Sequence, residues 1–182
     1  MEKETCWKIR LFWPWQDDRE EEWLEAISRD GWHLSKVGFS GVYFFHKGEP
    51  KHTVYRMDYQ IPSKKDRGAY LQLFRDAGWE HLGGSGWEYF RKEASPDEEP
   101  EIFTDPESKI KKYERICNDM VLLLAVLIVT GSSANLTLPG RGLLAVALQC
   151  MSFGLLASCA AAMIGIVRRI HQLKNSIRKN DT

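Results

Sequence analysis

One long apolar stretch constrains this chain more than any other feature of its sequence. Residues 120–167 contain a single charged side chain, Arg141. The two parts of the stretch, 120–138 and 143–167, are each long enough to cross the hydrocarbon core of a bilayer, which takes about 20 helical residues. Because a Pro-Gly-Arg-Gly segment interrupts the apolar run at its centre, we predict a two-helix transmembrane hairpin.

Flanking charges predict the orientation of these two spans. Residues 1–119 carry 19 Lys and Arg against 24 Asp and Glu, a net charge of −5, whereas residues 120–182 carry 6 against 1, a net charge of +5. Basic residues precede the first span and follow the second, while the turn has one arginine. The positive-inside rule then places both termini in the cytoplasm. An acidic soluble part also predicts no direct binding to nucleic acid.

Before the apolar stretch, the hydrophobic pattern predicts a small α+β domain over residues 1–92. Residues 7–13 alternate, with Trp7, Ile9, Leu11 and Trp13 on the face that a half-buried strand would bury. A helix follows from Asp17 to Gly31, then a strand pair over 32–46. A third strand, a second helix that ends at Gly78 and a second hairpin over 79–92 complete the domain.

The domain contains a twofold internal repeat. Each copy has a helix, a Gly-Trp pair, an aromatic hairpin and a closing lysine, with Gly31-Trp32 in the first copy and Gly78-Trp79 in the second. With the leading strands, the order is β-α-β-β-α-β, in which the second and fourth strands are elaborated into hairpins. That order predicts a ferredoxin-like split βαβ sandwich, an antiparallel sheet with two helices on one face.

Three further segments connect the domain to the membrane or follow it. Residues 93–105 are acidic and contain proline, which predicts a solvated linker. Residues 106–119 are predicted to form a juxtamembrane helix that continues into the first span. Residues 168–182 form a basic tail on the cytoplasmic side.

The aromatic residues of the repeats have two interpretations. A small domain fills its core with large side chains, so all of them are candidates for the core. Trp and Tyr are also enriched in binding surfaces, and roughly 90 residues bury so many rings with difficulty. The candidate partner-binding residues are Trp32, Tyr43, Trp79, Trp87 and Tyr89.

The second predicted span carries two rows of small residues spaced by four. Such rows let helix backbones approach closely in a bilayer. They would pack against the first span, against a second copy of the chain or against a transporter. The candidate packing residues are Gly154, Ser158, Ala161, Ala162 and Gly165.

The residue types needed for catalysis or metal binding do not occur in recognisable patterns. The four cysteines and five histidines lack ligand spacing, and the Gly-rich segment at 83–86 precedes no helix that would complete a phosphate cradle. No nucleophile–base motif is visible. We therefore predict a non-enzymatic protein with no metal and no cofactor.

Seven segments of the chain carry a further signal: Glu21–Leu24, Gly31–Leu34, Val54–Tyr59, Tyr70–Phe74, Asp76–Trp79, Tyr89–Lys92 and Glu101–Lys109. Together they resemble one known family of bacterial membrane proteins, the domain of unknown function number 2812. Members of this family resemble companions of PadR-type transcriptional regulators. The resemblance implies a regulatory role at the bacterial plasma membrane, with no catalytic residue to carry over.

These observations lead to two functional hypotheses. In the first, the chain is a membrane-anchored sensor or regulatory protein, and its cytoplasmic domain binds a cytosolic partner, such as a PadR-type regulator, or an amphiphilic ligand. In the second, the chain is an accessory subunit of a membrane export system that docks through its transmembrane hairpin. Exchanging the two spans for an unrelated hairpin separates these hypotheses.

Overall fold

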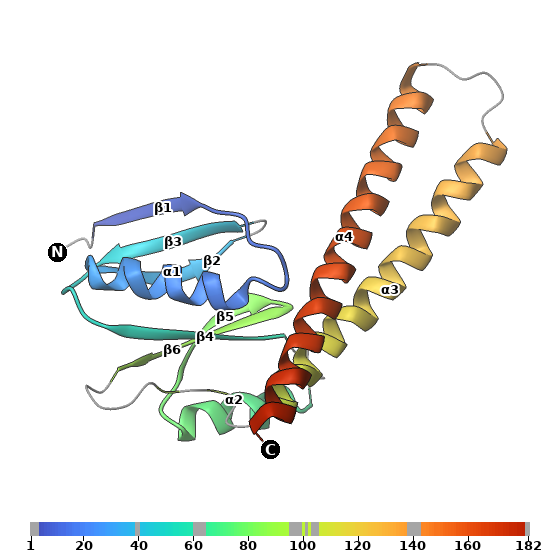
Figure 1. The fold of residues 1–182 in the computed structure, drawn as a ribbon. Helices are drawn as coiled ribbons and strands as arrows, with labels where there is room; N and C mark the ends of the chain where they lie inside the picture. Colours follow the sequence, from blue (N-terminus) through green and yellow to red (C-terminus); the bar gives the residue numbers. More distant parts are fainter. Residues whose placement is uncertain are drawn as a thin grey trace. The chain divides into compact units, whose positions relative to one another are not determined.

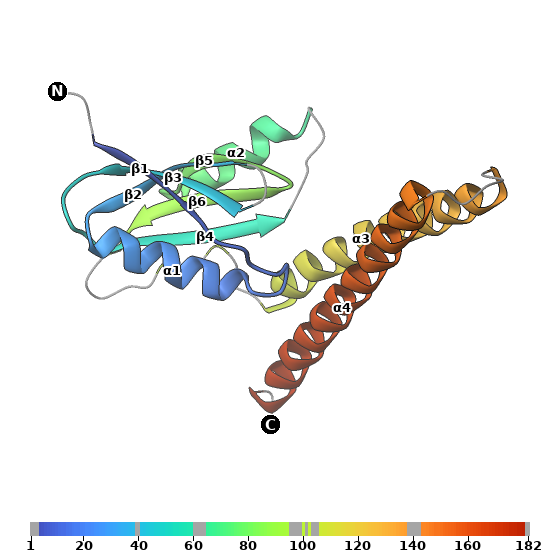
Figure 2. The same cartoon turned by 90° about the horizontal axis from the view of Figure 1, so that it is seen from above.

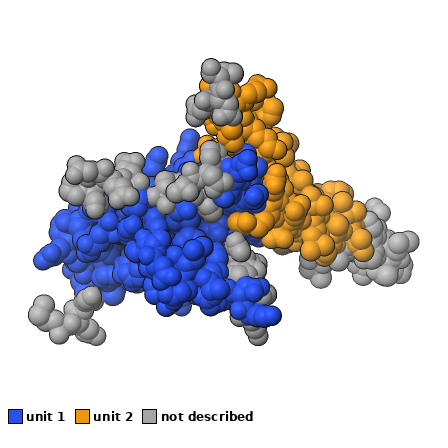
Figure 3. Space-filling view, turned by 90° about the horizontal axis from the view of Figure 1, so that it is seen from below, with its two compact units in different colours: residues 1–112 blue, residues 113–182 orange. Residues whose placement is uncertain are grey.

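The computed structural model of the chain forms two compact units, residues 1–112 and 113–182 (Figure 3). The residues described are 4–38, 41–59, 65–94, 100, 102, 106–137 and 143–180. Most of the predicted linker 93–105 and the predicted turn between the spans lie outside the described residues.

The first unit has the element order that the repeat predicts (Figure 1). Its elements are β1 (Thr5–Ile9), α1 (Asp17–Arg29), β2 (Trp32–Val37), β3 (Val42–Lys47), β4 (Thr53–Tyr59), α2 (Arg67–Asp76), β5 (Glu80–Ser85) and β6 (Trp87–Glu93).

The strands form two antiparallel three-stranded sheets, where the ferredoxin-like prediction has one sheet. Sheet A has the order β1-β3-β2 and sheet B the order β4-β6-β5. Each hairpin folds back onto the strand that precedes its own helix, so each repeat completes its own sheet. In each sheet, the strand before the helix in sequence (β1 or β4) and the strand after it (β2 or β5) run parallel to each other. The last strand of the repeat (β3 or β6) lies between them and is antiparallel to both. The split βαβ arrangement therefore occurs within each repeat.

The main core lies between the two sheets. The inner face of sheet A and helix α1 contribute Leu24, Ile27, Leu34, Tyr43 and Phe45, and sheet B contributes Tyr55, Met57 and Tyr89. The opposite face of sheet B packs on α2 in a second cluster of Val54, Phe74, Trp79 and Phe90. The ribbon seen from above shows strands of the two sheets crossing, with α1 and α2 on opposite sides (Figure 2). Sheet B is thus covered on both faces.

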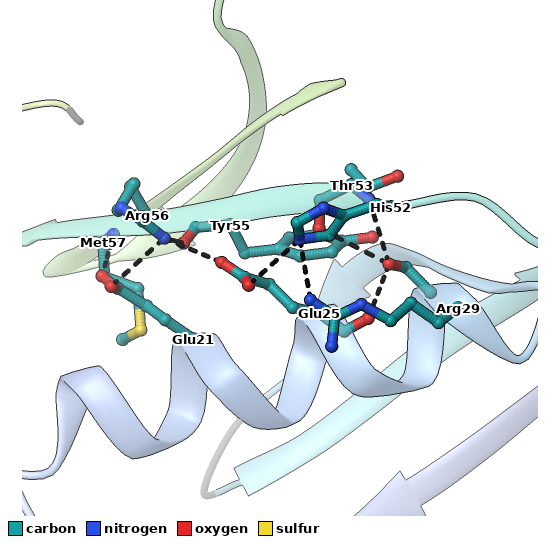
Figure 4. A network of polar contacts seen from close by, with 9 residues as sticks. Glu21, Glu25, Arg29, His52, Thr53, Tyr55, Arg56 and Met57 are labelled. Atoms are coloured by element: carbon teal, nitrogen blue, oxygen red, sulfur yellow. Dashed lines mark hydrogen bonds and ion pairs between the residues drawn. The ribbon is translucent and has the colours of Figure 1, made fainter. Parts of the chain in front are cut away.

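Helix α1 also covers the free edge of β4 (Figure 4). Because β4 bonds to β6 through its even-numbered residues, its odd-numbered backbone groups point away from the sheet. The Ser28 hydroxyl accepts the N–H of Thr53 at 3.2 Å, and the Glu21 carboxylate accepts the N–H of Met57 at 2.8 Å. At the end of the edge, the Lys112 ammonium donates to the Met57 carbonyl at 3.3 Å. Side chains therefore replace the missing neighbouring strand.

Strand β1 differs from its prediction in length and in exposure. It ends at Ile9, and Leu11 and Trp13 follow in a non-strand segment. The four side chains predicted on the buried face are exposed, with exposed fractions of 64% for Trp7, 62% for Ile9, 73% for Leu11 and 45% for Trp13. Alternation shows that one face is apolar, but burial needs a second layer, and no described element covers this face.

The second unit contains most of α3 (Pro106–Thr137) and all of α4 (Leu143–Asn180). Within this unit the Arg169 side chain donates to the Tyr113 hydroxyl at 3.4 Å. In the described residues, one helix segment is long and apolar enough to cross a membrane. It is Gln149–Lys179 in α4, whose most apolar stretch of 18 residues has a mean hydropathy of 2.1.

The two-span prediction is therefore reduced to one candidate span. The described side chains of α3 end at Val129, so only ten residues of the predicted span 120–138 have described side chains. These ten residues are uncharged, but an 18-residue stretch that ends at Val129 also includes Lys112, Glu114, Arg115 and Asp119. The described apolar part of α3 is therefore too short to count as a candidate span.

Candidate functional site: a pocket shared by the two repeats

A pocket of about 410 Å³ lies in the first unit where the two repeats meet. It is bordered by the starts of β2 and β5, the ends of β3 and β6 and the segment that joins β3 to β4. The lining residues are His33, His46, Lys47, Gly48, Glu49, Lys51, Thr53, Gly78, Glu80, Arg91, Lys92 and Glu93. Most of these residues have charged or polar side chains, although carbon atoms make up the larger part of the surface that faces the pocket.

Equivalent positions of the two repeats line this one pocket. Alignment of the Gly-Trp pairs and closing lysines matches the His33–His46 pair of sheet A to the Glu80–Arg91 pair of sheet B, and Lys47 to Lys92. Both pairs are cross-strand neighbours in their own sheets. The pocket therefore lies where equivalent positions of the two repeats meet, and both repeats contribute to its wall.

The two closing lysines make the same contacts in both repeats. The Lys47 ammonium donates to the Asp30 carbonyl at 3.3 Å and lies 4.7 Å from the Trp32 ring. The Lys92 ammonium donates to the Ala77 carbonyl at 3.1 Å and lies 5.9 Å from the Trp79 ring. In the part of the chain that the structure describes, neither lysine forms an ion pair with a carboxylate. Both keep a formal charge available to a ligand.

Four of the other charged groups of the pocket form two ion pairs, whereas the Glu49 carboxylate has no ion-pair partner among the described residues. The Arg91 guanidinium forms two hydrogen bonds of 2.8 Å with the Glu80 carboxylate. The Lys51 ammonium pairs with Glu93 and lowers the pKa of the Glu93 carboxyl. The pocket is therefore slightly cationic, because four cationic side chains face three carboxylates. The electrostatic balance favours an anion.

One buried hydroxyl on the pocket wall is unsatisfied. Thr53 is 3% exposed, and its Oγ1 has no hydrogen-bond partner among the described residues, whereas its backbone N–H is bonded to Ser28. A buried hydroxyl without a partner costs about 1–3 kcal/mol.

Two glycines explain why the Gly-Trp pairs recur. Gly31 and Gly78 end α1 and α2 in the left-handed region, with φ of +80° and +81°. A Cβ on Gly31 would also lie 2.8 Å from the Gly48 carbonyl oxygen. Only glycine adopts this conformation without strain, and it turns the chain from the helix into the strand that borders the pocket.

The predicted partner-binding residues do not form one exposed surface. Tyr43, Trp79 and Tyr89 are buried, and Trp32 and Trp87 are half-buried. The core interpretation therefore describes the three buried rings. Whether any of the five residues binds a partner stays a prediction.

Two of the buried rings hold a buried carboxylate. The Tyr43 and Tyr89 hydroxyls donate to the same oxygen of Glu20 at 2.6 and 2.7 Å. Burial raises the pKa of Glu20 and of both tyrosines above their ordinary values. This cluster joins α1 to both sheets and lies away from the pocket, so its role is structural.

The rows of small residues on α4 are only partly buried. Ala162 is 3% exposed, together with the neighbouring Cys159 and Ile166. Gly154, Ser158 and Ala161 are exposed, and Gly165 is half-buried. Their role in helix packing stays a prediction.

Sequence reasoning did not single out the pocket residues as a site. The closing lysines were visible as equivalent residues of the two repeats, but their convergence with His33 and His46 depends on the joining of two separate sheets. In the described residues, no three His, Cys, Asp or Glu side chains lie close enough together to hold a metal ion.

Comparison with known proteins identifies the family and nothing more specific. No curated protein and no solved structure matches the chain. A family model described as "protein of unknown function (DUF2812)" matches residues 16–126, which include every element from α1 to β6 and the larger part of α3 but not β1. The chain therefore belongs to this family, as its motifs indicate.

Proposed function

We propose that this chain is a membrane-anchored, non-enzymatic regulatory protein whose first unit binds a small anionic ligand in the pocket shared by the repeats. Ligand binding changes how the domain engages a cytosolic protein, for which a PadR-type regulator is the leading candidate. The second unit is the anchor, with α3 and α4 as two spans and both termini in the cytoplasm.

The observation that carries this proposal is the convergence of both repeats on one cationic pocket. Lys47 and Lys92 contribute charges without carboxylate partners in the described residues, and Thr53 contributes a buried hydroxyl without a partner. An anion that contacts both lysines would bridge the two repeats. It would stabilise one arrangement of sheets A and B over others, and such differential binding is what a regulatory switch requires.

The test measures anion binding to the full-length protein in detergent micelles. Inorganic phosphate and succinate serve as probes, and thermal shift and calorimetry report binding. Stabilisation depends on the ratio of ligand concentration to Kd, so a saturating probe should raise Tm by several degrees. The double variant Lys47→Gln/Lys92→Gln should lose this response, whereas Lys8→Gln, at an exposed lysine of β1 outside the pocket, should keep it.

Equal responses in the wild type and in both variants would show that the anions bind elsewhere. No response to either probe, together with no response to other small anionic metabolites, would refute the ligand-binding proposal. Cross-linking in native membranes with and without the effective anion then shows whether the set of captured partners changes.

One observation favours the second function, an accessory subunit of an export system. Gly154, Ser158 and Ala161 are exposed on α4, where another membrane helix could approach closely. Replacing α3 and α4 beyond Asp119 with an unrelated hairpin should abolish the function of an accessory subunit and preserve that of a tethered regulator.

A further inference from the structure

Five large apolar side chains form an uncovered surface on the first unit. This β1 surface consists of Trp7, Ile9, Leu11, Trp13 and Phe44, whose exposed fractions range from 42 to 73%. Monomeric soluble domains rarely leave so many large apolar residues exposed together, and such patches mark sites of interaction.

The strand register places three of these side chains, Trp7, Ile9 and Phe44, on one face, and Leu11 and Trp13 follow β1 in the chain. Trp7 is opposite Phe44, and Ile9 is opposite Val42, so their side chains share the outer face of sheet A. The inner face carries Cys6, Tyr43 and Phe45, which pack in the core. Past the end of β1, the Trp13 ring stacks on Trp15 with a centroid distance of 5.1 Å. The surface is thus a sheet face extended by an aromatic pair.

The charged side chain on this face is basic. It is Lys36, which is opposite Phe44. None of the described residues at the outward-facing positions of β1 and β3 is acidic. A face with Trp, aliphatic residues and a lysine, and without acidic groups, complements the interfacial layer of an anionic bilayer.

The chain itself favours a bilayer as the occupant of this face. Its α4 is long and apolar enough to cross a membrane, so a bilayer would be within reach of the domain at all times. A tether of this kind raises the effective concentration of a weak second contact, which then needs little intrinsic affinity.

We infer that the β1 surface docks on the interfacial layer of the bilayer that anchors the chain. The Trp7 and Trp13 rings enter the headgroup region, with Ile9 and Leu11 beside them and Lys36 near lipid phosphates. This inference rests on the membrane anchor of the proposed function and is independent of the ligand in the pocket.

The distribution of tryptophan provides a direct test. All seven tryptophans lie between residues 7 and 87, and none lies in α3 or α4. Full-length protein in nanodiscs of phosphatidylglycerol and phosphatidylcholine would therefore report domain–lipid contact through quenching of its Trp fluorescence by brominated acyl chains. The double variant Ile9→Ser/Leu11→Ser removes apolar area and keeps all seven tryptophans. Leu73→Ser on α2, where the side chain is 69% exposed, is the matched control.

We expect quenching of the wild type, a loss of at least half of it in the double variant and no change in the control. Quenching should weaken in nanodiscs without phosphatidylglycerol. Equal quenching in all three proteins, or none in the wild type, would overturn the inference. Efficient cross-linking between copies through Trp7→Cys, without lipid quenching, would assign the surface to a second copy instead. Failure of the protein to co-purify with nanodiscs would refute the anchor itself.

Discussion

The two repeats have the same topology, yet equivalent faces of their sheets differ in burial. Met57 of β4 is 2% exposed, whereas Trp7 holds the equivalent register position of β1 and is 64% exposed. Tyr89 of β6 is 6% exposed, whereas the equivalent Phe44 of β3 is 42% exposed. Sheet A and α1 cover this face in the second repeat, and no described element covers it in the first.

The free edges of the sheets differ in the same way. Side chains of α1 and Lys112 bond to the outward backbone groups of β4. Strand β1 bonds to β3 through Glu4 and Arg10, so Thr5, Trp7 and Ile9 direct their N–H and C=O groups away from the sheet. None of these outward groups bonds to another described residue. A duplicated topology therefore leaves one repeat enclosed and the other open to a partner or a bilayer.

The largest effect is expected from the ion pair at the end of the covered edge. The Lys112 ammonium lies 2.5 Å from the Asp17 carboxylate, and both residues are buried. Lys112→Met removes this ion pair from a buried carboxylate and should lower the free energy of unfolding by about 3–5 kcal/mol. Lys8→Met on the open strand should change it by less than about 0.5 kcal/mol. Denaturant unfolding followed by Trp fluorescence measures both values, and similar values would contradict the contrast between the edges.

A second effect is a pH dependence carried by the covered edge. Burial raises the pKa of Glu21 from its ordinary value of 4.5 to about 8. The positive charges of Lys112 and Arg56 lower this pKa, but their effect is smaller than that of burial. Between pH 4.5 and pH 8, Glu21 therefore keeps its proton in the folded state and loses it in the unfolded state. The free energy of unfolding is then highest at low pH and falls as the pH rises towards 8.

The free energy of unfolding should thus fall by roughly 2–4 kcal/mol between pH 5 and pH 8, since one pKa unit corresponds to about 1.4 kcal/mol. Glu21→Gln keeps an oxygen for the Met57 N–H and should flatten most of this dependence. Unfolding curves of both proteins at the two pH values provide the measurement. A stability of the wild type that rises over this range would refute the assignment.

The hydroxyl of Ser28 should contribute less. It accepts the Thr53 N–H and donates to the Glu25 carbonyl at 2.8 Å, in a buried position. Ser28→Ala leaves the Thr53 N–H without a partner and should cost about 1–2 kcal/mol in unfolding free energy. Thr5→Ala on the open edge is the matched control and should cost less than about 0.5 kcal/mol. An equal cost at both positions would mean that β1 is also covered.

The smallest effect concerns the exposed face itself. Ile9→Thr removes apolar area that is already in contact with solvent, so the free energy of unfolding in micelles should change by less than about 0.5 kcal/mol. Met57→Ala at the enclosed equivalent face should cost about 2–5 kcal/mol. Comparable losses would show that the outer face of sheet A has an unrecognised covering layer.

Sequence patterns predicted the local structure well and the long-range contacts poorly. The Gly-Trp repeats, helix stops and alternating stretches predicted the element order, because these signals depend on neighbouring residues. The division into two sheets depends on which strand each hairpin pairs with. The exposure of Trp7 to Trp13 depends on the absence of a covering layer, which alternation does not report.

The candidate site shows the same limit. Lys47 and Lys92 were recognisable as equivalent closing residues, but their meeting in one pocket requires the packing of sheet A against sheet B. The buried Lys112–Asp17 pair joins residues that are 95 positions apart, and charged residues are expected at the surface unless such a partner is known. Most aromatic residues that were candidates for a surface instead fill the core.

The most direct test of the contrast between the repeats is hydrogen exchange at single amides of the full-length protein in micelles. The amides of Thr53 and Met57 should be protected, because α1 side chains bond to both. The amides of Trp7 and Ile9 should exchange at rates close to those of an unstructured peptide, since they point outward from an open edge. Equal protection of the two pairs would show that β1 is covered and would contradict the account.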